Sequence, residues 1–418
     1  MKPFSFIHTA DLHLDSPFTG LRQVDGTVAS LIKDATFRGF DNVVDLALRH
    51  QVDFFLVAGD VYDSSDRSLR AQLKFADGLK KLAEAGVRSF ICHGNHDPLD
   101  GWSASLRWPE GVHIFGPDLE SIPLAVGGED VVVVHGISYP TSHIDENFGK
   151  DFRRQGSYPF QIGLFHCSVG SDPAHETYAP RTMDELVAAG LDYWALGHVH
   201  AHRVLKDDHP FIAYPGNTQG LHIREPGPRG CLVVRVDGQG NVDARFEPTD
   251  AVRWFSKDIQ INDLETEADL IEALERGCDE ICLEAQGRPA IARITIVGRG
   301  ALHPVLRRSH VVADLTERLR ETGLESSPPL WIEAIQIQTS SLVDLDSRRN
   351  SADFVGEVLR LIENSRRNPT ALQEMISELY HDRRVRRLLE IPGEEKLGEI
   401  LSEVESMCLD MLVAEDTE

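Results

Sequence analysis

The segment ICHGNHDPLD, from Ile91 to Asp100, runs from an apolar stretch directly into Asn95, His96 and Asp97. An amide oxygen, an imidazole and a carboxylate can each bind a metal ion or take part in proton transfer. Polar residues also follow strands for ordinary reasons, because Asn and Asp are common turn formers. The segment therefore predicts either a simple turn or one part of a metal site, and the other strand ends distinguish the two.

Side chains of the same kind follow four other short apolar segments in the first half of the chain. Taken singly, each is more readily explained as a turn former or a hydrogen-bonded surface group. Chance does not readily place D-x-H, G-D, G-N-H-D, a strand-terminal His and G-H-x-H in this order after five apolar segments. The carboxyl ends of strands are also the edge at which open α/β sheets bind ligands. Together the segments predict one metal site, with the ligand candidates Asp11, His13, Asp60, Asn95, His166, His198 and His200.

The donor types indicate which metals and which chemistry this site would suit. Oxygen and imidazole ligands without thiolate favour Mn²⁺, Fe or Zn²⁺, and Asp60 is the candidate bridge because a carboxylate can bind two ions. Two ions about 3.5 to 4 Å apart can hold a hydroxide nucleophile and bind the attacking and leaving oxygens of a phosphoryl displacement. Gly59, Gly94 and Gly197 each directly precede a ligand candidate, which favours tight turns into the site. The pattern predicts a phosphoesterase site.

The elements that must position these residues alternate between strands and helices. Strands are predicted for FSFIH, DFFLVAGD, VRSFICHG, DVVVVHG, QIGLFHC and LDYWALGH, which are short and apolar, as buried strands are. Helical periodicity covers Val28 to His50 and Leu69 to Ala85. This βαβ beginning and the strand-rich part that follows predict an α/β layered domain, which we expect to end near Pro248.

The rest of the chain predicts a smaller unit and a helical end. AIARITIVG, VVADLTERLRE and LWIEAIQIQT, within residues 289–340, are predicted as a strand, a helix and a strand. After Ser347 the chain is helical and Arg-rich through Leu389, and the segment from Gly393 holds nine acidic residues against one Lys. The length of 418 residues agrees with two or three domains at roughly 150 residues each.

Composition narrows the class of protein. No apolar run approaches the ~18 residues that span a bilayer, and the start lacks the pattern of a secretory signal, so we expect no membrane association. The six cysteines are scattered without a CxxC pair, which is typical of reduced thiols in the cytoplasm. The net charge of -25 argues against broad attraction to nucleic acid. A role on DNA would need a local basic patch, bound cations or a partner protein.

Several motifs resemble those of a known family, the calcineurin-like metallophosphoesterases. FIHTADLHLDSPFTGL, LVAGDVYDSSDRS, ICHGNHD, GLFHCSVG, WALGHVHAHRVL and AYPGNTQG are similar, more narrowly, to SbcD-type DNA repair exonucleases of the YhaO-like branch. The resemblance covers roughly residues 4 to 250. It implies an α/β fold with a layered β-sandwich core flanked by helices, a small α+β capping domain and a helical C-terminal region. We expect a nuclease domain at 1–250, a linker and capping-like domain at 251–346, and a helical, partner-docking region at 347–418.

The resemblance also implies a role for each ligand candidate. It assigns two divalent ions, with Mn²⁺ expected and Fe, Zn²⁺ or Mg²⁺ as alternatives. His96, one residue beyond a ligand, would act as a general acid or stabilise the transition state on the leaving-group side. One metal would be bound by Asp11, His13 and His200, the other by Asn95, His166 and His198, and Asp60 would bridge both.

Asp63 is a second catalytic candidate with two interpretations. It stands three residues after Asp60, where phosphoprotein phosphatases and SbcD-type enzymes also have Asp, and its carboxylate could orient His96 and favour its acid role. It could equally be a turn residue that caps the helix after Ser64. Ser64 itself stands where phosphoprotein phosphatases have an Arg that binds phosphate, which argues against a protein phosphatase.

The function implied by the resemblance is hydrolysis of DNA phosphodiester bonds in repair, by attack of a metal-bound hydroxide. The protein would be a metal-dependent hydrolase of the exonuclease or endonuclease type. Family members commonly act with an SMC-like ATPase of SbcC type and form homodimers, so the expected partners are DNA, this ATPase and a second copy. Two alternatives stay open: a phosphodiesterase or phosphatase for a small phosphate ester or nucleotide, and a noncatalytic scaffold for the ATPase.

The remaining polar residues near the motifs predict supporting roles. His8 and His135 alternate with apolar strand residues, so we expect hydrogen-bonded core groups that support the site without binding metal. In YPGNTQG, Asn217 is predicted to serve the geometry of a turn more readily than to bind phosphate.

Overall fold

The structure is a computed structural model that describes residues 1–21, 25–63, 67–104, 106–144, 148–170, 179–341, 348–377 and 392–412. It divides into two compact units. The first comprises Met1–Ser256, Ile281–Ala292 and Gly323–Glu333, and the second Lys257–Glu280, Arg293–Thr322 and Ala334–Glu418. The predicted domain boundaries at residues 250 and 346 stay predictions.

The first sheet of the first unit presents four parallel strands. Its order is β12-β11-β1-β2-β3-β4. Parallel pairing runs from β1 through β4, and antiparallel β11 and β12 extend the sheet beyond β1. The carboxyl ends of β1, β2 and β3 therefore lie at one edge. The strands are β1 (Phe4–Thr9), β2 (Phe54–Ala58), β3 (Arg88–Cys92), β4 (Val112–Ile114), β11 (Gly230–Val236) and β12 (Val242–Pro248).

The second sheet repeats this arrangement in the order β5-β6-β7-β8-β10-β9. Strands β6, β7, β8 and β10 are parallel, and antiparallel β5 and β9 form the two edges. The carboxyl ends of β7 and β8 thus also lie side by side. The strands are β5 (Glu120–Val126), β6 (Glu129–Gly136), β7 (Phe160–His166), β8 (Tyr193–Gly197), β9 (Arg203–Lys206) and β10 (Phe211–Tyr214).

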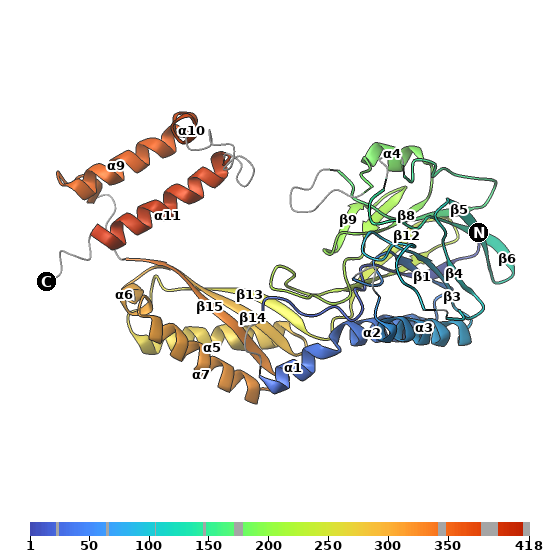
Figure 1. Cartoon of the computed structure of the whole chain (residues 1–418), viewed down its shortest axis with the longest axis horizontal. Helices are drawn as coiled ribbons and strands as arrows, with labels where there is room; N and C mark the ends of the chain where they lie inside the picture. Colours follow the sequence, from blue (N-terminus) through green and yellow to red (C-terminus); the bar gives the residue numbers. More distant parts are fainter. Residues whose placement is uncertain are drawn as a thin grey trace. The chain divides into compact units, whose positions relative to one another are not determined.

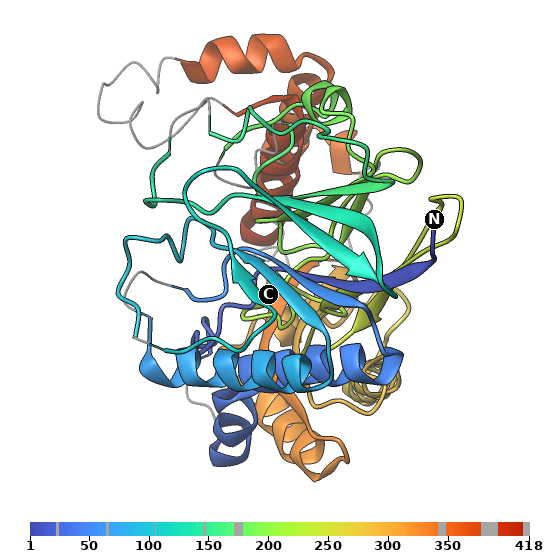
Figure 2. The same cartoon turned by 90° about the vertical axis from the view of Figure 1, so that its right-hand side faces the viewer.

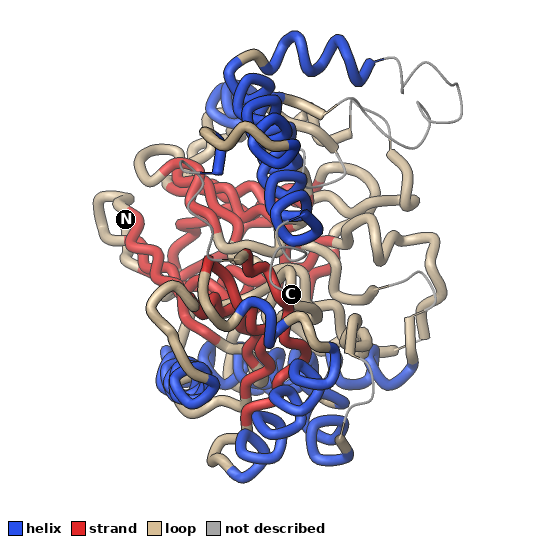
Figure 3. The backbone as a smooth tube through the Cα atoms, turned by 90° about the vertical axis from the view of Figure 1, so that its left-hand side faces the viewer, coloured by secondary structure: helices blue, strands red, loops and turns tan. Residues whose placement is uncertain are grey.

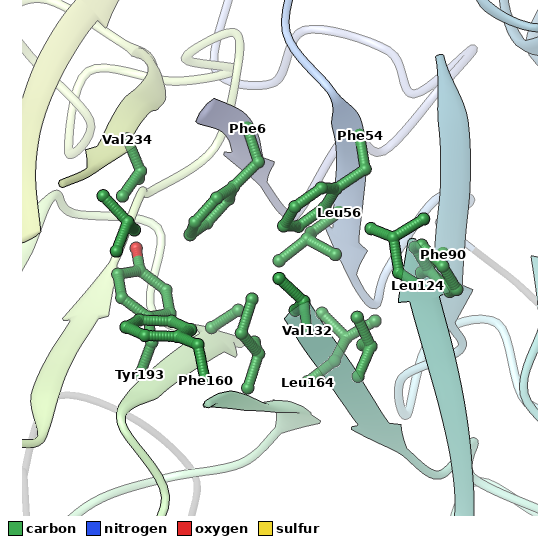
Figure 4. Packing of buried hydrophobic residues seen from close by; sticks show 14 of the residues in the cluster. Phe6, Phe54, Leu56, Phe90, Leu124, Val132, Phe160, Leu164, Tyr193 and Val234 are labelled. Carbon is green, nitrogen blue, oxygen red and sulfur yellow. The ribbon is translucent and has the colours of Figure 1, made fainter. Parts of the chain in front are cut away.

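A continuous apolar layer holds the two sheets face to face (Figure 4). The Phe6 ring stacks on Phe54 within the first sheet, with centroids 4.8 Å apart, and meets Tyr193 of the second sheet edge-on at 5.1 Å. Such aromatic pairs contribute about 0.5 to 1.5 kcal/mol each beyond their buried area. Because this layer fixes one sheet against the other, it also fixes the distance between their carboxyl ends.

Helices cover the outer face of the first sheet. In Figure 2, α2 (Ala35–His50) and α3 (Leu69–Glu84) lie side by side along it, and their apolar faces pack on β1, β2 and β3. The helix predicted from Val28 to His50 is two helices, because α1 (Gly26–Lys33) ends at Asp34 before α2 begins. The outer face of the second sheet packs against loops and the short α4 (Met183–Ala188).

A third sheet, in the order β13-β14-β15, follows the sandwich along the chain. Its strands are β13 (Arg253–Gln260), β14 (Ala290–Arg299) and β15 (Leu330–Ser340), and α5 (Glu267–Glu284), α6 (His303–Leu306) and α7 (Ser309–Glu325) connect them. The predicted strand, helix and strand within 289–340 are present. β13 and α5 were not among the predicted elements.

Three described helices end the chain: α9 (Phe354–Arg367), α10 (Pro369–Ser377) and α11 (Glu394–Leu412). Figure 1 shows α9 and α11 running alongside each other, and Figure 3 draws the described helices of the chain in blue. The buried Glu405 of α11 accepts hydrogen bonds from Arg349 at 3.0 Å and from Arg366 of α9 at 2.9 Å. The Arg-rich segment HDRRVRRLLE, predicted to be helical, lies outside the described residues.

The predicted α/β class, with stacked sheets, flanking helices and a helical end, is confirmed. In the part of the chain that the structure describes, every helix is too short or too polar to cross a membrane.

Candidate metal centre

The strand exits of both sheets deliver the seven ligand candidates to one place. Strands β1, β2 and β3 are parallel neighbours in one sheet, and β7 and β8 are parallel neighbours in the other. The ligand-type atoms of Asp11, His13 and His200 lie within 4.8 Å of one another, and so do those of Asp11, Asp60 and His166. Side chains that the sequence separates by up to 189 residues thus form one cluster around Asp11.

The first half of the cluster joins β1 to β8. His13 Nε2 lies 3.1 Å from His200 Nε2. The other ring nitrogen of each is occupied, because Nδ1 of His13 donates to Asp63 at 3.0 Å and Nδ1 of His200 donates to Glu225 at 2.6 Å. In the neutral form of each ring, Nε2 therefore carries the lone pair, and the two Nε2 atoms face each other. Ligands bound at about 2 Å to one ion lie roughly 3 Å apart, so the pair fits a shared cation.

The second half joins β2, β3 and β7. His166 Nδ1 donates to the carbonyl of Ala58 at 2.9 Å, which leaves Nε2 as the ligand atom. That Nε2 lies 3.0 Å from Asn95 Oδ1 and 3.3 Å from Asp60 Oδ2, again spacings that suit one cation. The ring of His198 lies beside His166, with centroids 5.3 Å apart.

Asp60 lies between the two halves, as expected of a bridging carboxylate. Its Oδ2 is 3.3 Å from His166 Nε2 and 3.9 Å from His13 Nε2. Its Oδ1 accepts the backbone N–H of His96 at 3.1 Å. The same carboxylate thus meets ligands of both halves and fixes the backbone of the catalytic candidate.

Tight backbone geometry makes this convergence possible. A Cβ at Gly94 would collide with the Asp60 carboxylate, so only glycine fits before Asn95. Four ligand candidates adopt left-handed backbone themselves: Asp11 (φ 50°), His13 (φ 41°), Asp60 (φ 50°) and His198 (φ 101°).

Charge in the cluster favours bound cations. Burial alone would lower the pKa of His13, but Asp63, Asp60 and Asp11 raise it to about 9. Burial also opposes a charged His166, whose contact with Asp60 nevertheless raises its pKa to about 9. Burial raises the pKa of Asp11, whereas that of Asp60 lies far below its usual range, against burial, because His166 and His13 are adjacent. Divalent ions can replace the protons that these imidazoles hold.

The two catalytic candidates lie next to each other at the surface of the cluster. The His96 side chain is 45% exposed, and its Nδ1 lies 3.3 Å from the Asp63 carbonyl and 3.6 Å from the Asp63 carboxylate. The Asp63 carboxylate is closer to His13, at 3.0 Å. The helix that follows, α3, begins at Leu69 and is capped by Ser68, so Asp63 does not cap it. Ser64 lies outside the described residues.

Asp97, the last polar residue of GNHD, organises the loop. It is fully buried and accepts hydrogen bonds from the N–H of Gly94 at 2.7 Å, the N–H of Val61 at 2.9 Å and His93 Nδ1 at 2.9 Å. Its carboxylate therefore links the loop after β3 to the loop after β2.

The other supporting predictions agree with the structure. His8 is buried and lies 3.0 Å from the Tyr193 hydroxyl and 3.1 Å from the Leu196 carbonyl, as expected of a hydrogen-bonded core group. Asn217 is buried and donates to Glu225 at 3.1 Å, which agrees with a structural role in its turn.

Glu225 is the residue of the cluster that the sequence did not indicate. It is 6% exposed and bonds to His200 from 25 residues further along the chain. Burial would raise its pKa, but the hydrogen bond from His200 lowers it to about 2. Its only signal in the sequence is an acidic residue in a loop rich in Pro and Gly, which is not specific.

A two-sheet α/β sandwich with Asp, Asn and His side chains gathered at its strand exits is the arrangement of a metal-dependent phosphoesterase. The family model for calcineurin-like phosphoesterases matches residues 4–202, and the model for the middle domain of metallophosphoesterase YhaO matches residues 254–340. An uncharacterized metallophosphoesterase of Bacillus subtilis, YhaO, is 31% identical over 418 residues and covers 100% of both chains. The chain therefore belongs to the calcineurin-like metallophosphoesterases, in the YhaO-like branch related to SbcD and Mre11.

More distant relatives have names that refer to nucleic acid. The DNA double-strand break repair protein Mre11 of Aeropyrum pernix is 28% identical over 254 residues, which is 56% of this chain and 59% of that protein. The SbcD component of the nuclease SbcCD of Bacillus subtilis is 24% identical over 275 residues, or 58% of this chain and 68% of that protein. The resemblance inferred from the motifs is confirmed.

Proposed function

We propose that the protein is a phosphodiesterase that hydrolyses DNA with two divalent metal ions, Mn²⁺ foremost. The observation that carries the proposal is the meeting of seven side chains with oxygen or imidazole donor atoms beside the half-exposed His96. This set fits two ions that share Asp60, and hard or intermediate donors without thiolate suit Mn²⁺.

The residues of the site would have two roles, metal binding and proton transfer. Asp11, His13 and His200 would hold one ion and Asn95, His166 and His198 the other. When bound, two such ions lower the pKa of water and neutralise charge on the phosphoryl group. The backbone of His96 is fixed by Asp60, and its exposed side chain would donate a proton to the departing oxygen.

DNA is favoured over a small ester by the names of the relatives. The SbcD component of SbcCD is named as part of a nuclease, and Mre11 as a DNA repair protein. The relative that covers the whole chain is named only as a metallophosphoesterase, so the assignment of DNA rests on the more distant relatives.

A partner ATPase of the SMC-like type fits the C-terminal helices. Phe354 and Leu361, seven residues apart on α9, are 67% and 64% exposed. On α11, Val404 and Met407 are 39% and 55% exposed. Residues spaced by three or seven lie on one face of a helix, so each helix presents apolar surface of the kind that binds a partner helix. A partner would also offset the net charge of -25 when the complex binds DNA.

The test is cleavage of end-labelled linear DNA, duplex and single-stranded, by the purified full chain with Mn²⁺ or with Mg²⁺. Asp60→Ala is the matched negative control, because it removes the shared ligand. Metal-dependent fragments absent from this variant would support the nuclease. No cleavage by a metal-loaded protein, together with hydrolysis of a small phosphodiester, would contradict the DNA substrate and favour the small-ester alternative.

A further inference from the structure

Three imidazoles of the metal centre, those of His13, His200 and His166, differ in the group that accepts their outer N–H. In the first half, carboxylates receive the outer N–H of both rings: Asp63 for His13 and Glu225 for His200. In the second half, the outer N–H of His166 goes to a neutral carbonyl, that of Ala58. An anionic acceptor makes an imidazole a stronger ligand than a neutral one does, so His13 and His200 should each bind a cation more strongly than His166 does.

Glu225 is built to hold His200 in one orientation. Oε1 accepts His200 Nδ1 at 2.6 Å, and Oε2 accepts the N–H of Leu221 at 2.8 Å and the Asn217 amide at 3.1 Å. Three donors converge on this buried carboxylate, so its side chain has one favoured position. Proton placement on Nδ1 leaves Nε2 of His200 as the ligand atom.

The backbone of His200 is fixed by the same loop. Its carbonyl accepts the Arg229 guanidinium at 2.6 Å and the N–H of Asn217 at 3.1 Å. Loss of the Glu225 carboxylate would therefore release the ring, while Arg229 would still hold the backbone carbonyl of His200.

We propose that Glu225 is a positioning residue that makes the half containing His13 and His200 the tighter of the two cation sites. It acts through His200 and touches no substrate. The inference rests on the proposed two-metal centre and adds to it an order of occupancy: the first cation enters beside Glu225, and the second enters the half of His166 and Asn95.

The test is a titration of the metal-free full chain with Mn²⁺, in which electron paramagnetic resonance counts the free ion. The wild type is expected to bind in two steps of different affinity. Glu225→Gln keeps the size of the side chain but replaces one acceptor oxygen by an NH₂ group. That group cannot accept the hydrogen bonds that Leu221 and Asn217 now donate to Oε2. We expect it to weaken the tighter step by about 10-fold to 100-fold and leave the weaker step unchanged.

Glu120→Gln is the matched control. Glu120 also pairs with an imidazole, His113 Nε2 at 3.1 Å, but touches no ligand candidate, so both steps should stay as in the wild type. Glu225→Asp, which keeps the charge and retracts it by one methylene, is expected to fall between the wild type and Glu225→Gln. If Glu225→Gln lowers the melting temperature of the metal-free protein, the Mn²⁺ affinities of Glu225→Asp decide whether Glu225 strengthens the tighter site.

Each other outcome overturns a defined part of the proposal. Two steps that Glu225→Gln and Glu225→Asp leave unchanged, or weaken equally, would contradict the role of Glu225 alone. Two equal steps in the wild type would contradict the order of occupancy. No Mn²⁺ binding by the wild type would contradict the metal centre itself. DNA takes no part in the titration, so a protein with another substrate would give the same two steps.

Discussion

His96 combines a fixed backbone with a side chain that is 45% exposed, which suits a group that gives up a proton. We expect His96→Asn to lower kcat for DNA by about 10²-fold to 10⁴-fold, the usual contribution of a general acid. Metal content should stay the same, because His96 is not among the seven ligand candidates.

A phosphodiester with a good leaving group separates this role from others. Bis(p-nitrophenyl) phosphate expels an anion that needs no proton, so His96→Asn should slow its hydrolysis far less than that of DNA. An equal loss with both substrates would contradict the acid role and favour transition-state stabilisation by His96.

Among residues, the sequence indicates the ligand candidates more readily than the residues that support them. Asp11 to His200 are recognisable because each follows a strand in a short motif, and strand ends meet at sheet edges. Glu225 belongs to no motif, and its partner is defined only when the loop after β10 folds back on His200. The Asp63 carboxylate lies closer to His13 than to His96. This also depends on side-chain directions, which the spacing of residues in the sequence does not determine.

At the scale of elements, β1 carries a buried titratable group in the core. Burial lowers the pKa of His8 to about 3, against 6.5 for an exposed histidine. Below pH 6.5 the unfolded chain therefore binds a proton that the folded chain does not, and folded stability falls as pH falls. Between pH 8 and pH 5 we expect this histidine to cost about 2 kcal/mol of the free energy of unfolding.

The check is chemical denaturation at several pH values with His8→Gln beside the wild type. The variant should be less stable at neutral pH. It should lose less stability on acidification, because Gln at position 8 cannot be protonated, and the other titrating groups contribute equally to both proteins. Parallel pH profiles would show that His8 is protonated equally in the two states.

The pair of α9 and α11 depends on one buried carboxylate. Glu405 accepts from Arg349 and Arg366, so Glu405→Ala removes the carboxylate that both guanidinium groups share. We expect a local loss of about 2 kcal/mol, as for hydrogen bonds to charged groups. Amide hydrogen exchange should accelerate in residues 354–367 and 394–412, and the strands of the sandwich should exchange as in the wild type. Faster exchange in β1 and β8 as well would contradict a local effect.

Elements with a strong periodic pattern were predictable, and those set by local contacts were not. The buried strands β2, β3, β7 and β8 are apolar runs bounded by polar turns. The break between α1 and α2 falls at Asp34. It could not be predicted, because no Gly or Pro marks it and the surrounding residues keep helical periodicity. In α5, Leu270, Leu274 and Ile281 recur at helical spacing and are buried, so the signal for this helix was present in the sequence and the prediction missed it.

At the scale of the whole molecule, the net charge of -25 should slow the association of the protein with a polyanion such as DNA. For the isolated protein, long-range repulsion from DNA should be screened by salt. We expect kcat/KM for a DNA substrate to rise between about 20 mM and about 150 mM monovalent salt, the reverse of ordinary DNA-binding proteins.

Bis(p-nitrophenyl) phosphate is the control, since a small monoanion feels this repulsion far less. A steep fall of kcat/KM for DNA with added salt would contradict the expectation and would indicate a basic surface that dominates the approach.

The backbone contacts between ligand positions have a consequence for how such a centre is inherited. His198 donates its backbone N–H to both oxygens of Asp11, at 3.0 and 3.2 Å, and the N–H of Asp11 is bound by the carbonyl of Gly59. Each left-handed ligand position is thus held by a different strand exit, and no single motif keeps its shape alone. A gene fragment that encodes one sheet would carry several ligands but no centre. Exchange of parts between genes can therefore pass on this chemistry only with the entire sandwich.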